Sequence, residues 1–149
     1  DQRARVNALM DTSRGIHQSE IREEVQNVMT EHVNVFRSEE GLEEALDKIQ
    51  EAKERYADVG VKDTSKTFNT DLIQALELRC ILDVAETITK GALQRTESRG
   101  AHWRYEHQER DDENWLKHTF ARYDEESGTP NIEYEDVEIK EYKPKVRTY

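Results

Sequence analysis

The residues best equipped for chemistry lie in one charged segment, RTESRGAHWRYEHQERDD, at positions 95–112. It holds four arginines, five acidic residues and two histidines. Imidazole nitrogens are common metal ligands, so His102 and His107, together with His118 further along the chain, could hold a metal ion. No two of these histidines stand at the i,i+4 spacing that places side chains on one face of a helix. The spacing therefore disfavours a metal site.

An acid–base site is a second interpretation of the segment. Glu97, His102 and Asp111 are residue types that serve as general acids and bases. Such a site needs a pocket, and a chain of amphipathic helices and a hairpin leaves little room for one. A third interpretation is structural, because the forked guanidinium of arginine pairs well with carboxylates and backbone carbonyls. The residues alone favour this arginine-rich docking loop over an active site.

The chain as a whole is acidic. Its 149 residues carry a formal net charge of −11, which argues against a nucleic-acid partner because phosphate binding needs a basic face. Charged residues make up 37% of the chain and hydrophobic residues only 34%. A small hydrophobic core is therefore expected. Either amphipathic helices with narrow apolar stripes form it, or the chain is a domain that normally packs against a partner.

Three long helices are expected to position the charged segment. The first begins near Ser19, and the second begins at Ser38 and ends before Gly60, a favourable residue for a helix end. The third is capped by Thr70 or Asp71 and is the most apolar, with hydrophobic residues on more than one side. Short connections between them predict a mainly α fold, an antiparallel three-helix bundle that resembles a spectrin repeat.

A small β-hairpin is expected after the charged segment. The stretches WLKHTFARY (115–123) and NIEYEDVEI (131–139) alternate partly between apolar and polar residues. Gly128 and Pro130 lie between them as turn residues. A two-stranded hairpin is marginal alone, so it should pack on the bundle or on a partner. The closing YKPKVRTY is expected to be an extended tail.

These elements divide the chain into four parts. The expected division is a lead-in with at most a short helix (1–18), the three-helix bundle (19–95), an irregular charged docking loop (96–114), and the hairpin with its tail (115–149).

Other sequence signals narrow the choice of function. The chain has no GxGxxG, Walker, HExxH or GxSxG motif. No apolar run approaches 18 residues, so no membrane span is expected. Cys80 is the single cysteine and lies in an apolar helical run, which predicts a buried structural thiol and excludes an internal disulfide. The chain begins at Asp1 without a methionine, which indicates a fragment, although processing would give the same start.

An ordered series of motifs carries a family resemblance. RTESRGAHWR, RDDENWLKHT and the closing KVRTY together resemble the C-terminal domain of the flavoprotein subunit of succinate dehydrogenase and fumarate reductase. IREEVQNVMTEHVNVFRSEEGLEEALDKI and DTSKTFNTDLIQALELRCILDVAETI resemble the helical part of that domain. The resemblance covers residues 5–149. The stretch ESRGAH alone is less specific, because L-aspartate oxidase has a similar one.

The resemblance implies a function for a larger parent subunit. Such a subunit oxidises succinate to fumarate with a covalently bound FAD, and passes electrons to an iron–sulfur subunit and then to quinone. The resemblance implies that the family's flavin-linking histidine, proton-shuttling arginine and dicarboxylate-binding residues lie upstream of this domain, so no catalytic, cofactor-binding or metal-binding residue is expected in this chain. The resemblance therefore implies that FAD belongs to the parent subunit, and that this chain is a structural domain with no cofactor and no activity of its own.

The resemblance also implies partners and a location. The expected partners are the FAD-binding domain of the same subunit, the iron–sulfur subunit and a flavinylation factor, with no nucleic acid and no direct membrane insertion. The complex would lie peripherally on the cytoplasmic side of the inner membrane or on the mitochondrial matrix side. A homodimer of the isolated chain is a further expectation, because its docking face would be uncovered.

The resemblance assigns the charged segment to a seam with the FAD-binding domain. Gly100 would permit a tight turn there. Two alternatives stay open, namely the C-terminal domain of L-aspartate oxidase and a free-standing helical interaction module. The expected docking-loop residues are Glu97, Ser98, Arg99, Gly100, His102, Arg104, Arg110, Asp111 and Asp112.

Overall fold

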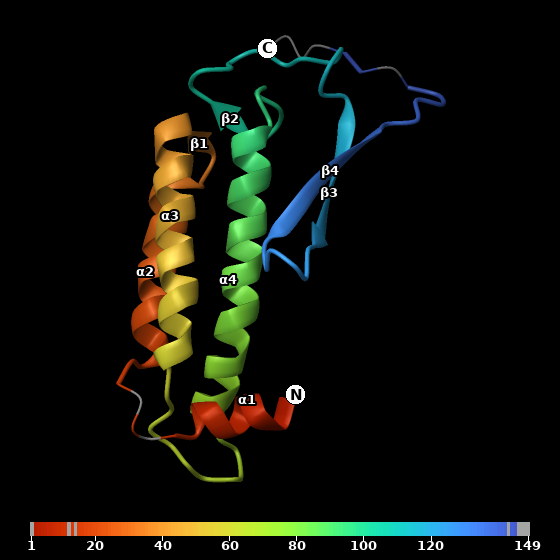
Figure 1. Ribbon diagram of the computed structural model, residues 1–149. Helices are drawn as coiled ribbons and strands as arrows, with labels where there is room; N and C mark the ends of the chain where they lie inside the picture. The colour runs from red at the N-terminus through yellow and green to blue at the C-terminus, as the bar shows by residue number, and fades with distance from the viewer. Residues whose placement is uncertain (1, 12, 14, 143, 146–149) are drawn as a thin grey trace.

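In the computed structural model, three long helices lie side by side in an up-down-up arrangement (Figure 1). They are α2 (Gln18–His32), α3 (Glu39–Arg55) and α4 (Thr70–Gln94). The structure describes residues 2–11, 13, 15–142, 144 and 145. The predicted fold class, a three-helix bundle followed by a charged loop and a hairpin, is confirmed.

The helix starts differ partly from those predicted. Ser38 caps α3 as expected, because its hydroxyl accepts the Gly41 amide at 3.1 Å. The cap of α2 is His17 instead of Ser19. The cap of α4 is Asn69, a buried residue, instead of Thr70 or Asp71. The carboxylate of Asp71 faces elsewhere, since it pairs with His17 at 3.0 Å and accepts the Lys62 amide at 2.8 Å.

Helix α3, the second of the three predicted helices, also ends differently from the prediction. It stops at Arg55 and continues as a short 3₁₀ turn, η1 (Tyr56–Asp58), so Gly60 is not the left-handed residue that ends it. Gly60 is instead buried where the chain packs against the lead-in, and its amide donates to the Ile16 carbonyl at 3.1 Å. The lead-in contains a helix, α1 (Gln2–Leu9), which crosses the base of the bundle and buries Leu9 in the core (Figure 1).

The core runs along the centre of the bundle, where helices α2, α3 and α4 contact one another. Small buried alanines on α3 and α4 belong to it. The main core residues are Leu9, Ile21, Val25, Ile49, Ala52, Val59, Val61, Ala75, Leu78, Leu82 and Ala85.

Cys80 does not belong to this core. The prediction of a buried thiol is wrong, because the Cys80 side chain is exposed. At about 100° per residue, a position two residues from both Leu78 and Leu82 faces away from the stripe that those leucines form. Cys80 therefore lies on a second apolar face of α4, together with Val84 and Ile88, which are 57% and 46% exposed.

Two small sheets complete the fold. The hairpin is formed by β3 (Lys117–Tyr123) and β4 (Pro130–Asp136), which pair antiparallel. It packs along α4, where Lys90 Nζ donates to the Pro130 carbonyl at 2.7 Å. A parallel pair that the sequence did not predict joins β1 (Phe36–Arg37) to β2 (Trp103–Arg104) at the top of the bundle (Figure 1). Of the expected tail, residues 143 and 146–149 lie outside the described residues.

Candidate functional site

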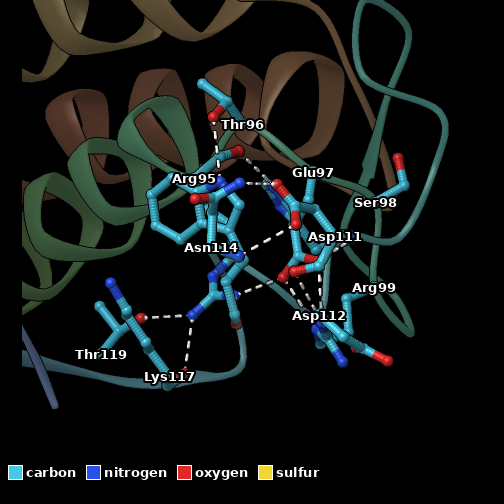
Figure 2. A network of polar contacts seen from close by, with 12 residues as sticks. Arg95, Thr96, Glu97, Ser98, Arg99, Asp111, Asp112, Asn114, Lys117 and Thr119 are labelled. Carbon is cyan, nitrogen blue, oxygen red and sulfur yellow. Dashed lines mark hydrogen bonds and ion pairs between the residues drawn. The ribbon is translucent and has the colours of Figure 1, made fainter. Parts of the chain in front are cut away.

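The segment 95–112 is organised around the carboxylate of Glu97, which is fully buried (Figure 2). Arg99 donates to both of its oxygens, Nε to Oε1 at 2.8 Å and Nη2 to Oε2 at 2.9 Å. Arg95 Nη1 donates to Oε1 at 2.5 Å, and the Asp111 backbone amide donates to Oε2 at 2.9 Å. Burial would raise the pKa of Glu97, but these hydrogen bonds outweigh it and hold the pKa below its ordinary value.

Arg95 links this carboxylate to the hairpin. Its guanidinium donates to the Trp115 carbonyl at 3.0 Å, and to the Lys117 carbonyl and the Thr119 hydroxyl, each at 3.0 Å (Figure 2). It also lies over the Trp115 indole, 5.1 Å from the ring centroid. One side chain thus connects the end of α4, the charged loop and the first strand of the hairpin.

A tight turn closes the first part of the loop. Arg99 and His102 exchange two backbone hydrogen bonds, at 2.8 and 3.0 Å, across a two-residue turn. Gly100 has a φ of +62°, which confirms the expected turn at this glycine. Ser98, which is also buried, accepts the Arg104 amide at 2.8 Å and donates to the His107 carbonyl at 2.7 Å.

Arg104 closes the carboxyl end of α4. The last carbonyls of a helix have no partner inside the helix and form the negative end of its dipole. Arg104, only 1% exposed, donates from Nη1 to the carbonyls of Ala92 at 3.0 Å and Leu93 at 2.9 Å. Its charge and its hydrogen bonds are therefore used inside the domain.

Arg37 binds the carbonyl end of α2 in the way that Arg104 binds that of α4. His102 lies between these two helix ends and contacts both. Arg37 donates to the Val33 carbonyl from Nε at 3.2 Å and from Nη2 at 3.1 Å. Its Nη1 lies 2.5 Å from His102 Nδ1, and His102 Nε2 lies 3.1 Å from the Arg95 carbonyl. An arginine can only donate and a carbonyl can only accept, so His102 is neutral with its proton on Nε2. Burial lowers the pKa of His102, and the charges of Arg37, Arg104 and Arg95 lower it further.

The acidic end of the segment is equally well paired. Asp112 accepts Arg99 Nη2 at 2.8 Å and Arg110 Nη2 at 2.7 Å, and these contacts lower the pKa of Asp112. The Asp111 side chain accepts the Asn114 side-chain amide at 2.8 Å and two backbone amides at 3.0 Å, which lowers its pKa. The segment is thus a closed polar network in which cations and carboxylates neutralise one another.

This geometry does not assemble an acid–base centre. Glu97 meets Asp111 through the backbone amide of Asp111, whereas His102 contacts Arg37 and the Arg95 carbonyl. Across the part of the chain that the structure describes, no three His, Cys, Asp or Glu side chains are close enough to hold a metal ion. The same described residues contain no helix both long and apolar enough to span a membrane.

Sequence reasoning omitted three residues that the network needs, namely Arg37, Arg95 and Trp115. Arg95 and Trp115 directly precede and follow the predicted loop, so their positions in the sequence could have indicated that they contact it. Arg37 and His102 are 65 residues apart in the chain, and no local pattern connects them.

A second surface feature is an apolar groove between α2 and α4, with a volume of about 740 Å³. It is formed along the face of α4 that carries Cys80. We call it the α2–α4 groove. Its lining residues are Val25, Gln26, Met29, Thr30, Cys80, Ile81, Val84, Ala85 and Ile88.

An aromatic patch lies at the top of the bundle, where β1 meets β2. The Phe36 ring is centred 6.5 Å from that of Trp103 and 6.4 Å from that of Tyr105. Phe36 and Tyr105 are 61% and 56% exposed, and Val35 beside them is 39% exposed. The aromatic patch thus consists of Val35, Phe36, Trp103 and Tyr105.

Comparison with known proteins gives consistent matches. Residues 22–149 match the family described as fumarate reductase flavoprotein C-term. A fumarate reductase flavoprotein subunit from Haemophilus influenzae is 47% identical over 146 residues, which cover 98% of this chain and 24% of that relative. A succinate dehydrogenase flavoprotein subunit from Coxiella burnetii is 46% identical over 99 residues, covering 66% of this chain and 17% of that relative.

The fold has a counterpart among solved structures. A structure of FrdA from Escherichia coli quinol fumarate reductase superimposes with a TM-score of 0.90 at 40% identity. The superposition covers 97% of this chain and 25% of that one. The chain spans about a quarter of the length of the fumarate reductase flavoprotein subunits that it matches along its length.

Proposed function

The chain belongs to the fumarate reductase flavoprotein C-terminal family, and we propose that it is the packing domain of a flavoprotein subunit that interconverts succinate and fumarate. In this proposal the FAD and the catalytic residues lie in the other three quarters of the subunit, which its relatives have and this chain does not cover. The chain itself supplies shape and contact surface.

The observation that carries the proposal is the uncovered α2–α4 groove. Val84 and Ile88 are large apolar side chains that remain about half exposed on a long helix. Apolar patches of this kind mark contact surfaces. Because the matched relatives are about four times as long as this chain, the occupant proposed for the groove is the remainder of the same subunit.

The charged loop acts in this proposal as an internal brace. We expected Arg99, His102 and Arg104 to reach across a seam, but their donors are already used within the loop and by α4. The loop therefore contributes to docking by holding the aromatic patch in place, since β2 supplies Trp103 beside Phe36. The residues that the sequence predicted at the seam are therefore still proposed to matter for docking, because they fold the loop that holds the aromatic patch.

The proposed partners follow from the family. The FAD-binding domain of the same subunit is the primary one, and the iron–sulfur subunit and a flavinylation factor are further partners in this proposal. One solved relative is FrdA of a quinol fumarate reductase, which supports partnership with other subunits. The proposed location is peripheral, on the cytoplasmic or matrix side of the membrane. If the chain is isolated, a homodimer through the α2–α4 groove is the expected result.

A pair of substitutions in the full-length gene product tests the proposal. The double variant Val84→Glu, Ile88→Glu places two carboxylates in the groove, where an apolar partner cannot satisfy them. The variant is expected to lose most of its bound FAD and its succinate–fumarate activity. Phe68→Glu is the matched control, because Phe68 is 95% exposed in a loop outside the groove. Unchanged FAD content and activity in the double variant would refute the proposal.

A further inference from the structure

The α2–α4 groove lies between two helices that point the same way. Helices α2 and α4 both run from the base of the bundle to its top, and α3 runs in the opposite direction (Figure 1). The three helices contact one another, so α3 fills one side of the pair formed by α2 and α4. The groove is lined by residues of α2 and α4, so it lies on a side of the pair that α3 leaves uncovered.

The walls of the groove are rows of side chains spaced four residues apart. On α4 one such row is formed by Cys80, Val84 and Ile88, and on α2 Val25 and Met29 repeat with the same spacing. Rows of this spacing are the ridges between which the side chains of another helix pack. A surface of this kind binds an amphipathic helix, whose apolar residues recur at i, i+3, i+4 and i+7.

The groove is also uncharged. Charged residues make up 37% of the sequence, but the lining residues, all within the described part of the chain, carry no charge. The acids of α4 in this stretch, Asp83 and Glu86, turn toward α3, where both pair with Lys53. A segment that covers the groove must therefore present an apolar face, because a charge that is buried without a counter-charge is costly.

The direction of the two helices favours one orientation of a third helix in the groove. The amino ends of α2 and α4 carry a partial positive charge, and both lie at the base of the bundle (Figure 1). The carboxyl end of a helix in the groove is stabilised when it also lies at the base. Such a helix runs from top to base, as α3 does on the other side of the pair, and completes the up-down-up-down arrangement of a four-helix bundle.

We propose that the α2–α4 groove receives an amphipathic helix from the remainder of the same subunit, running antiparallel to α2 and α4. This inference rests on the proposed packing role, and it adds the form, direction and chemistry of the segment that packs there. The matched relatives have such a remainder, since this chain covers about a quarter of their length. Cys80 and Ile88 are eight positions apart on α4, or about 12 Å, so the helix makes at least about two turns in the groove.

The test is photo-crosslinking in the full-length gene product, with p-benzoylphenylalanine at Cys80 in one variant and at Ile88 in another. Each variant is first checked for the FAD content of the wild type, so that only packed protein is compared. Peptide mass spectrometry then identifies the captured residue. Both variants are expected to capture one peptide of the same subunit. The residue captured from Ile88 should precede the one captured from Cys80 by about seven or eight positions, because a helix rises about 1.5 Å per residue.

Two further placements of the probe complete the experiment. Lys48 is the matched control, because it is exposed on α3 outside the groove, and the probe there should not capture this peptide. Gln26 and Thr30 on α2 line the groove and are exposed, so they serve as a second pair if the probe at Ile88 lowers the FAD content. The residue captured from Thr30 should precede the one captured from Gln26 by about four positions.

The possible results separate this inference from the packing role. Captured residues only about four positions apart for Cys80 and Ile88 would indicate an extended strand, which rises about 3.3 Å per residue. That result, or the reverse order of capture, would overturn the antiparallel helix and leave the packing role standing. Capture of another subunit or of a second copy of this chain, or of nothing from either pair, would overturn both.

Discussion

Arg99 holds the buried carboxylate of Glu97 in a two-point grip, with Nε donating to Oε1 at 2.8 Å and Nη2 donating to Oε2 at 2.9 Å. Only Ser98 separates the two residues, so this pair of hydrogen bonds constrains the backbone just before the turn at Gly100. A guanidinium committed in this way has little left for an outside partner. The arginine-rich segment is therefore a brace that, together with the ends of α2 and α4, shapes the top of the bundle.

The first prediction concerns the hub of this brace. Glu97→Gln removes the negative charge that faces Arg95 and Arg99, and leaves two cations close together. Breaking one side of a buried ion pair typically costs 3–5 kcal/mol, and the arginines can reach water here, so a loss of about 3 kcal/mol is expected. Denaturant unfolding of the 149-residue chain measures it. Glu113→Gln, an exposed acid on the same loop, should change the stability by less than about 0.5 kcal/mol.

The second prediction concerns the end of α4. Arg104→Met keeps the apolar stem but leaves the carbonyls of Ala92 and Leu93 without a partner in a buried site. Each unsatisfied buried group costs about 1–3 kcal/mol, so the variant should be destabilised by about 3 kcal/mol. Arg122→Met, on the exposed side of the hairpin, serves as the control. A thermal unfolding midpoint equal to that of the control would contradict the capping role.

The third prediction concerns the hairpin. Arg95→Lys keeps the positive charge but cannot reach Glu97, Trp115 and Lys117 at once, because an ammonium lacks the fork of a guanidinium. The backbone amides of β3 should then exchange with deuterium faster, while those of α3 keep their protection. Hydrogen-exchange mass spectrometry resolves the two elements. Equal protection of β3 in the variant and the wild type would show that Lys90 and the other contacts of α4 suffice.

The fourth prediction concerns pH. The folded protein keeps His102 neutral, and its pKa is lowered by burial and by three arginines. The unfolded chain therefore binds more protons in the window just below the ordinary histidine pKa of about 6.5. Its contribution to stability is complete above that pH and is lost as the pH falls toward the folded pKa. From pH 7 to pH 5, the unfolding free energy of the wild type should fall more steeply than that of His102→Gln, and equal slopes for the two proteins would contradict the lowered pKa of His102.

The sequence predicted the elements better than their connections. The spacing of apolar residues located α2, α3 and α4, and partial alternation located the hairpin. Ser38 and Gly100 were identified correctly because capping and left-handed turns depend on the residue itself. The caps of α2 and α4 were misplaced. Asn69, Thr70 and Asp71 are three consecutive residues of types that cap helices, and His17 is not among the residue types that capping rules favour.

Composition located the charged loop, but it could not predict the contacts that the loop makes within the chain. The charged loop was expected to face a partner, whereas Glu97 and Arg104 are almost completely buried. Sequence rules place such residues at the surface, because burial is tolerated only when partners compensate the charge. Glu97 is compensated by Arg95, Arg99 and the Asp111 backbone amide, and Arg104 by the carbonyls at the end of α4, and only the fold brings these groups together. The exposure of Cys80 was predicted wrongly for a related reason. An apolar helix face in the sequence does not show whether another part of the same chain covers it.

The exposed thiol of Cys80 offers the most direct test of the packing-domain account. It lines the α2–α4 groove, and within this chain it is accessible to solvent. In the full-length gene product, maleimide labelling followed by peptide mass spectrometry should find Cys80 at least about a hundredfold slower to react than in the same protein unfolded by denaturant. Such protection would have to come from outside these 149 residues. Rapid labelling of Cys80 in the native full-length protein would contradict the account.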